Sequence, residues 1–374
     1  MKQAIVAIAA LCCAAPALAQ LGQLKKGLEK AQKLQDLQIS EQEERDLGAS
    51  FSERIRTAYG VVQDPAVQKY VALVGTVLAQ ASTRPGLEWK FIVLDTDAVN
   101  AFAAPGGYVH ITRGALGLIK TEAQLAGVLG HEITHVTNKH TLEAIQKNKL
   151  VQAGANETLA GNQELLKKVV DQSYNLIIEN KFDRGDEAEA DRNGVALANK
   201  LGYAPAGLAE FLGGLLERNK GQTTSHGLFA SHPETQERID RIKSQIAADK
   251  LTATATVEPR YRKNISYTAK PQGEIAMVDP GVRGVAGGGT AKDGDKDKKE
   301  SDDKDKSKEK KKGFGLGSLT RPLAPEKQSA QVTSSGGSRG VGDPDRNAKG
   351  GDNPAIVVVR LTPADIAEFK KGIS

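Results

Sequence analysis

Residues 121–137 read Thr-Glu-Ala-Gln-Leu-Ala-Gly-Val-Leu-Gly-His-Glu-Ile-Thr-His-Val-Thr. The opening threonine, with a glutamine three residues later, has the pattern of a helix N-terminus, and apolar residues recur at helical spacing behind it. His131 and His135 are four residues apart, so a helix places both imidazoles on one face, with Glu132 beside them. The stretch therefore predicts a core helix that presents two histidines and a carboxylate to one metal ion.

Zinc is the ion that these ligands favour. It accepts imidazole nitrogens, and a catalytic zinc site has three protein ligands and leaves the fourth position to water. Glu132 is then the expected general base, because it can take a proton from that water. The bare five-residue pattern arises by chance in about one per cent of chains of this length, so its surroundings have to support it.

A third metal ligand is expected downstream of the second histidine. In one class of zinc peptidase it is a histidine six residues further on, but Thr141 stands there in this chain. His140 falls one residue short, and we expect it to be solvated on another face of the helix. A glutamate from a later helix is the other solution.

Two glutamates, Glu157 and Glu187, compete for this place. One helical turn after Glu187 comes Asp191, which can accept the second N–H of a ligand histidine, whereas Gly161 stands at the same place after Glu157. Glu187 is therefore the favoured third ligand. Between Glu187 and Asp191, Glu189 is expected to point outward.

Around the motif, the patterns predict an α+β fold that is mainly helical, with a small β-sheet. Strands are expected at Trp89–Leu94 and Tyr108–Thr112, and a turn with two glycines lies between them. Caps and apolar periodicity predict the following helices. They cover residues 21–58 (in two parts), 64–78, 121–137, 163–180, 186–201, 205–218 and 233–242.

The two ends of the chain differ from the middle in composition. Residues 1–19 have a lysine, a short apolar run and a small-x-small site, the pattern of a secretory signal peptide. Residues 272–352 are rich in glycine and in mixed charges, which predicts a disordered linker. Residues 353–374 are expected to be a short element, with a strand at Ala355–Val359 and a helix at Thr362–Lys371. The domain that remains, residues 20–271, contains the motif.

Composition excludes several classes of function. Both cysteines, Cys12 and Cys13, lie in the predicted signal, so we expect no disulfide and no cysteine nucleophile in the exported chain. A lipid anchor at either cysteine is disfavoured, because large or thiol side chains precede them. No later stretch has the roughly twenty apolar residues of a transmembrane helix. A net charge of +5 on 374 residues does not favour a nucleic-acid partner, and a periplasmic location is expected.

Further motifs stand around the helix: Asn100-Ala-Phe-Ala-Ala-Pro-Gly-Gly107, Thr112-Arg113-Gly114, Glu187-Ala-Glu-Ala-Asp191, and Ser231-His232-Pro233 followed by Arg238. Together with the histidine motif they resemble the HtpX/BepA family of zinc endopeptidases, which also holds the CAAX prenyl protease. The resemblance covers roughly residues 40–245. It implies a gluzincin-like fold, one Zn²⁺ per chain held by His131, His135 and Glu187, and Glu132 as the catalytic base.

The remaining site residues are assigned roles with alternatives. Asp191 is expected to orient a ligand histidine. His232 could stabilise the oxyanion or occupy the open metal position, or it could only cap the helix that begins at Pro233. Arg238 could bind a substrate carbonyl or form a structural ion pair.

Substrate binding is expected at an exposed sheet edge, where main-chain pairing supplies affinity with little sequence preference. By resemblance, the segment that begins Asn100-Ala101-Phe102 is the candidate for that edge, and its alternative is an ordinary hairpin turn. Many family members span membranes, but this chain looks like the periplasmic branch. It lacks the helical repeats that follow the protease domain of the BepA type.

Two functions from different classes remain. The first is a zinc-dependent endopeptidase of the cell envelope that acts on unfolded or extended polypeptides, with misfolded and outer-membrane assembly proteins as the substrate class that the resemblance implies. The second is a metal-binding chaperone or adaptor with little or no proteolytic activity. The presence of all four motif residues argues against the second, because a protein without catalysis would tolerate the loss of Glu132.

Overall fold

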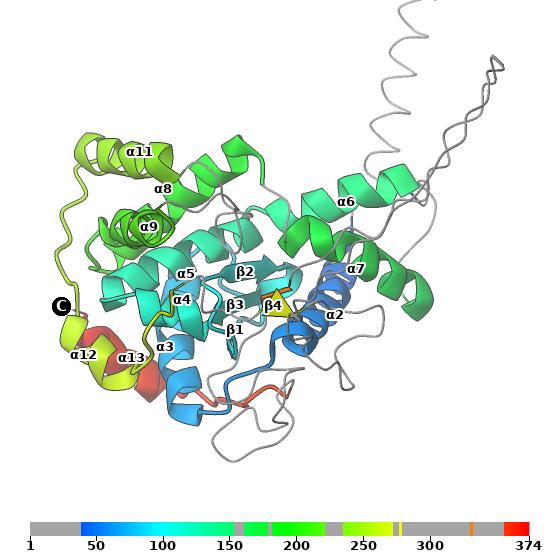
Figure 1. Cartoon of the computed structure of the whole chain (residues 1–374), viewed down its shortest axis with the longest axis horizontal. Coiled ribbons are helices and arrows are strands. Elements are labelled where there is room, and N and C mark those ends of the chain that lie inside the picture. Colours follow the sequence, from blue (N-terminus) through cyan, green and yellow to red (C-terminus); the bar gives the residue numbers. More distant parts are fainter. Residues whose placement is uncertain are drawn as a thin grey trace, which may run out of the picture.

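A computed structural model describes residues 39–152, 161–178, 182–220, 235–271, 277–278, 330–331 and 355–373. The motif helix, α5 (Glu122–Thr137), lies at the centre, and all its residues up to Val136 are buried. A small sheet packs against α5, and further helices surround the two (Figure 1). The fold is thus mainly helical with a small sheet, as predicted.

Helices α3 (Pro65–Ala81) and α5 begin at the predicted caps. The Asp64 side chain accepts hydrogen bonds from two backbone amides at the start of α3, and Pro65 occupies its first position. Thr121 caps α5 by accepting a hydrogen bond from the backbone amide of Gln124. The other helices are α2 (Glu41–Tyr59), α3 (Pro65–Ala81), α4 (Arg113–Leu118), α6 (His140–Gln152), α7 (Gln163–Ile178), α8 (Arg184–Lys200), α9 (Gly207–Arg218), α11 (Thr235–Ala248), α12 (Glu258–Asn264) and α13 (Pro363–Lys371).

The sheet contains β1 (Lys90–Leu94), β2 (Ala101–Ala104) and β3 (Tyr108–Thr112) in the order β1-β3-β2. β3 pairs in parallel with β1 and antiparallel with β2. The short 3-10 turn η1 (Pro105–Gly107) connects β2 to β3. β2 was not predicted as a strand. Three of its four residues are alanines, which give no strand signal, and the reversal of the chain is confined to η1, where Gly106 and Gly107 adopt φ values of 71° and 98°.

Both faces of the sheet are covered by helices, and each face contributes to a different hydrophobic core. Phe91 and Val93 of β1 point into the larger core, which is shared with α3, α5 and α9. Ile92 and Leu94 point to the opposite face, where α2, α6 and α7 supply a second core. Because α5 packs on the sheet from the side of the larger core, the motif helix is anchored in that core.

The C-terminal residues 355–373 lie against α3 and α12 (Figure 1). Helix α13 begins at Pro363 behind a capping box of Thr362, close to the predicted start. The predicted strand at Ala355–Val359 is wrong, because these residues join no sheet in the described part of the chain. The outer edge of β1 is already taken, since Val62 and the side chain of Gln68 bond the backbone of Val93.

Several predictions fall outside the described residues. These are the signal peptide, Glu157, His232 and most of the linker. Within the linker, the described strands β4 (Met277–Val278) and β5 (Ala330–Gln331) pair antiparallel. None of the described helices is both long and apolar enough to cross a membrane.

Candidate metal centre

Three buried side chains from two helices converge at the motif. The Nε2 atoms of His131 and His135, both on α5, lie 3.1 Å apart. Glu187 on α8 places its carboxylate oxygens 3.7 Å from Nε2 of His131 and 3.4 Å from Nε2 of His135. Ligands about 2.0–2.2 Å from a tetrahedral zinc ion are separated by distances of this order.

Glycines allow the two helices to approach closely enough for this contact. A Cβ atom on Gly194 of α8 would lie 2.6 Å from the backbone nitrogen of His131, and one on Gly130 of α5 would lie 2.9 Å from the Gly194 carbonyl oxygen. Both distances are too short for a real side chain. The pair therefore sets the spacing that brings Glu187 to the two histidines.

A buried ion-pair network surrounds the ligands. Asp191, one turn after Glu187, lies 3.0 Å from Nδ1 of His131. Arg238 of α11 donates two hydrogen bonds to Asp191, at 2.9 and 2.7 Å, and its third nitrogen lies 3.0 Å from Glu187. Arg238 thus lies in an ion pair, the alternative role that was kept open for it, and its contact with substrate stays a prediction.

The charges of this network determine its protonation. Burial on its own raises the pKa of the Asp191 carboxyl, but the charge and hydrogen bonds of Arg238, with a smaller effect of His131, outweigh burial and hold that pKa below its usual value. Burial likewise works to lower the pKa of Arg238, and the carboxylates of Asp191 and Glu187 raise it above its usual value. Asp191 is therefore ionised and can accept a hydrogen bond from the N–H at Nδ1 of His131.

The donor set fits zinc. With Nδ1 of His131 donating to Asp191, the Nε2 lone pair of that ring faces Nε2 of His135 and the Glu187 carboxylate. His131, His135 and Glu187 are the one such cluster of possible metal ligands within the described ranges. Two imidazole nitrogens and one carboxylate oxygen, all buried, match a zinc site with an open fourth position.

The candidate base lies next to this cluster. Glu132 is 1% exposed. Together with His131 and Arg238 it borders a small hollow whose other walls are apolar and come from α5 and α9: Val128, Leu208, Phe211 and Leu212. This places a buried carboxylate beside the cluster, where it could exchange protons with a reacting water.

The part of the chain that contains this site matches a known peptidase family. Residues 65–246, which include α5, α8 and most of α11, match peptidase family M48. These residues form an M48 peptidase domain. Every residue of the candidate centre lies within the matched M48 domain.

Curated relatives carry related names. A beta-barrel assembly-enhancing protease of Yersinia pestis is 24% identical over 240 residues, which are 58% of this chain and 47% of that protein. The metalloprotease YcaL of Escherichia coli is 29% identical over 168 residues, 44% of this chain and 65% of that protein. The mitochondrial metalloendopeptidase OMA1 of Arabidopsis thaliana is 32% identical over 145 residues, 39% of this chain and 29% of that protein. The chain thus spans less than half of the first of these relatives.

One histidine of the M48 domain is not where it was expected. His140 was predicted to be solvated, but it is 5% exposed and its Nδ1 lies 3.1 Å from Nδ1 of His135. Helix α5 ends at Thr137 and α6 begins at His140, with Lys139 at a φ of 62° between them. This left-handed residue turns the chain, so positions on a continuous helix do not apply.

Two further contacts of the site were also missed. Glu189 does face solvent, as expected, with 53% of its side chain exposed, but its Oε2 lies 3.1 Å from Nε2 of His140. The ring of Phe182, just before α8, lies 4.2 Å from that of His135. The asparagine at position 138 that ends α5 is the one sequence signal that could have indicated the turn.

The predicted substrate-binding segment forms the edge strand β2, but its side chains are buried. Asn100, Ala101 and Phe102 are no more than 4% exposed, and Phe102 stacks on Tyr59 in the second core. The hydroxyl of Thr141 on α6 donates to the carbonyl of Ala103. Any pairing with substrate would use the main chain of β2, and this role stays a prediction.

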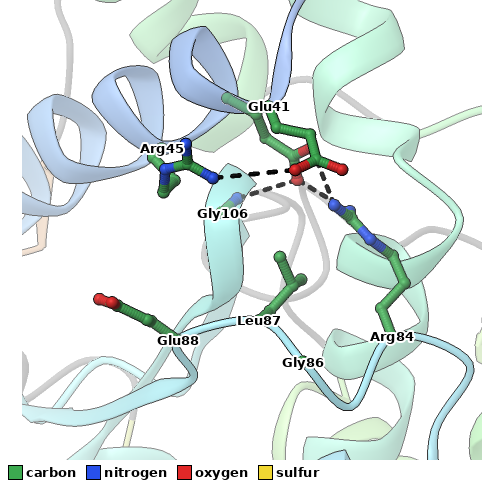
Figure 2. A pocket seen from close by; sticks show the side chains of 8 residues that line it. Glu41, Arg45, Arg84, Gly86, Leu87, Glu88 and Gly106 are labelled. Atoms are coloured by element: carbon green, nitrogen blue, oxygen red, sulfur yellow. Dashed lines mark hydrogen bonds and ion pairs between the residues drawn. The ribbon is translucent and has the colours of Figure 1, made fainter.

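A larger pocket of about 480 Å³ lies away from the ligands, between α2, η1 and the loop before β1 (Figure 2). In it, Glu44 accepts hydrogen bonds from both terminal nitrogens of Arg84 and from the amide of Gly106. Arg84 also bonds the carbonyl of Val136, next to His135. These contacts tie the end of α5 to the β2–β3 hairpin.

Proposed function

We propose that this M48 protein is a zinc-dependent endopeptidase of the cell envelope that cleaves unfolded or extended polypeptides. The observation that carries this proposal is the buried convergence of His131, His135 and Glu187, with Glu132 beside them. The names of the bacterial relatives support substrates among misfolded and outer-membrane assembly proteins. A periplasmic location, after removal of residues 1–19, belongs to the same proposal.

The residues of the site have separate tasks in peptide hydrolysis. When bound by His131, His135 and Glu187, zinc supplies a Lewis acid that activates water and polarises the scissile carbonyl. Glu132 takes a proton from the attacking water and passes it to the leaving amine. Asp191, held by Arg238, keeps His131 in the tautomer whose Nε2 faces the metal position.

The test is cleavage of casein by the purified exported chain, with zinc content measured on the same samples. We expect Glu132→Gln to retain zinc and to lose about 10²–10⁴-fold in rate, because only proton transfer is removed. Glu187→Ala should lose zinc. Glu143→Gln, the same chemical change on an exposed residue of α6, is the matched control and should cleave normally.

Each negative result has a definite meaning. A native protein that contains no zinc would contradict the metal site itself. A native protein that contains zinc but cleaves neither casein nor other unfolded chains would favour the metal-binding chaperone or adaptor instead. If Glu132→Gln cleaved as fast as the native protein, the assignment of Glu132 as the base would be wrong.

A further inference from the structure

His140 and Glu189 make a contact to which the proposed function assigns no role. Nδ1 of His140 lies 3.1 Å from Nδ1 of His135, and Nε2 of His140 lies 3.1 Å from Oε2 of Glu189. The side chain of His140 is 4% exposed and that of Glu189 is 53% exposed. A buried imidazole thus bridges a histidine of the metal centre and a carboxylate at the surface.

The chemistry of these groups determines which atom donates at each step. An ionised carboxylate only accepts hydrogen bonds, so Nε2 of His140 carries the proton that is donated to Glu189. A neutral imidazole has one ring proton, so Nδ1 of His140 is an acceptor and Nδ1 of His135 donates to it. Nε2 of His135 therefore keeps its lone pair, and this is the atom that faces His131 and Glu187.

We propose that His140 and Glu189 are positioning residues that hold His135 in the tautomer and orientation in which its Nε2 binds the metal. His131 is oriented by direct contact with a carboxylate, Asp191. His135 is oriented through the intervening imidazole of His140. Outer partners of metal-binding histidines typically change metal affinity by about 10–100-fold. The inference rests on the proposed function only in that His135 is taken as a ligand.

The backbone around His140 is shaped for this contact. Lys139 adopts a φ of 62°, a left-handed conformation that is unfavourable for a non-glycine residue. This turn ends α5 and returns His140 toward His135. The ring of Phe182 packs on the imidazole of His135. Asp186 adds a longer contact, with its Oδ1 3.9 Å from Nε2 of His140. Residues from α6, α8 and the segment before α8 therefore meet around His135.

The experiment measures the zinc dissociation constant of the full exported chain by competition with a chromophoric chelator. We expect His140→Ala to bind zinc about 10–100-fold more weakly than the native protein. His140→Gln should recover most of the affinity, because its amide oxygen can accept from His135 while its amide nitrogen donates to Glu189. Thermal unfolding of the zinc-free proteins shows whether each variant is folded.

Glu189 has a matched control on α11. Glu237 is 54% exposed and pairs with Arg241 within its own helix, so Glu237→Ala removes an equally exposed, paired carboxylate from a different helix. We expect Glu189→Ala to weaken zinc binding by up to about 10-fold. Glu237→Ala should leave zinc binding unchanged. The double variant of His140→Ala with Glu189→Ala should equal His140→Ala alone, because Glu189 acts only through His140.

A spectroscopic measurement separates positioning from general destabilisation. Cobalt(II) bound in place of zinc reports ligand geometry through its visible absorption. We expect His140→Ala to change the intensity and position of these bands, and His140→Gln to restore them. A variant that was only less stable would retain the native spectrum at saturating cobalt.

The outcomes also separate this inference from the proposed function. If native protein binds zinc and cleaves casein, and His140→Ala binds zinc as tightly and has the native cobalt spectrum, the positioning role is overturned while the protease remains. Additive losses in the double variant would overturn the route through His140. If native protein binds no zinc, the proposed function fails first.

Discussion

At the scale of single residues, the surroundings of a histidine in this chain decide its chemistry. His110 is fully buried on β3, with its Nε2 2.9 Å from the hydroxyl of Ser52. Burial, and then the positive charge of Arg56, lower the pKa of His110 to about 3. It is thus kept neutral in the second core, on the face of the sheet opposite to the larger core around α5.

The lowered pKa of His110 makes stability depend on pH. Between about pH 6.5 and pH 3 the unfolded chain binds a proton at His110 that the folded protein does not bind, so stability falls as the pH falls through this window. At about 1.4 kcal/mol per unit of pKa, roughly 2 kcal/mol is lost between pH 7.5 and pH 5. We expect His110→Gln to lack this contribution, so that its free energy of unfolding depends less steeply on pH.

Urea unfolding of the zinc-free protein, with a chelator present, measures this effect at pH 7.5 and pH 5. Removal of zinc is necessary because metal ligands also take up protons at low pH. The comparison is between the pH dependence of the native protein and that of the variant. Equal dependence in both would show that His110 is not the group that titrates.

At the scale of elements, the spacing of residues in the sequence predicts which side chains share a helix face, while glycines set the distance between the packed helices. Two histidines four apart and two acids four apart each share a helix face, and this could be predicted from the sequence. The approach of α8 to α5 could not, because it depends on Gly130 and Gly194 meeting across the helices. The role of Arg238 was left open because its partner Asp191 is 47 residues away in the sequence. His140 was misplaced because a turn at Lys139 brings it back to His135, five residues earlier.

Strand predictions show the same limit. Residues rich in branched and aromatic side chains were correctly predicted as β1 and β3. Their parallel pairing, and the strand β2 between them in sequence, depend on contacts that no local pattern contains. The run at Ala355–Val359 has strand-like composition, but it joins no sheet in the described part of the chain, so composition alone misleads there.

The glycine contact predicts a change in metal binding from one added methyl group. Gly194→Ala places a Cβ 2.6 Å from the backbone of His131, so α8 must shift away from α5. We expect weaker zinc binding and a loss of about 1–3 kcal/mol in the free energy of unfolding, typical of overpacking. Chelator competition and urea unfolding measure the two quantities.

Gly213 provides the matched control for this substitution. It lies within α9, and an added Cβ there meets nothing within 4 Å. Gly213→Ala should leave zinc binding unchanged and stabilise the protein by up to about 1 kcal/mol, because alanine is the better helix former. Zinc binding of native strength in Gly194→Ala would contradict the role of the glycine contact.

At the scale of the whole molecule, the side chain of Arg260 links the C-terminal helix α13 to the start of the motif helix α5. Glu122, fully buried at the first position of α5, accepts hydrogen bonds from Tyr70, Tyr203 and Arg260. Arg260 also donates to the carbonyl of Phe369 on α13 and lies over its ring at 4.0 Å. The far end of the chain thus packs around the N-terminus of the helix that holds the metal ligands.

This connection predicts that α13 is part of the folded peptidase domain, although it lies outside residues 65–246 that match the family. Phe369 is 8% exposed and packs in the larger core, so Phe369→Ala should lower the free energy of unfolding by about 3–5 kcal/mol. Glu368→Ala, one position earlier and 78% exposed, should change it by less than about 0.5 kcal/mol. Urea unfolding followed by tryptophan fluorescence measures both, since Trp89 packs against the same core. If Phe369→Ala had the same urea midpoint of unfolding as the native protein, α13 would be only loosely attached. The hydrogen bonds of Glu122 would then hold α5 without a contribution from α13.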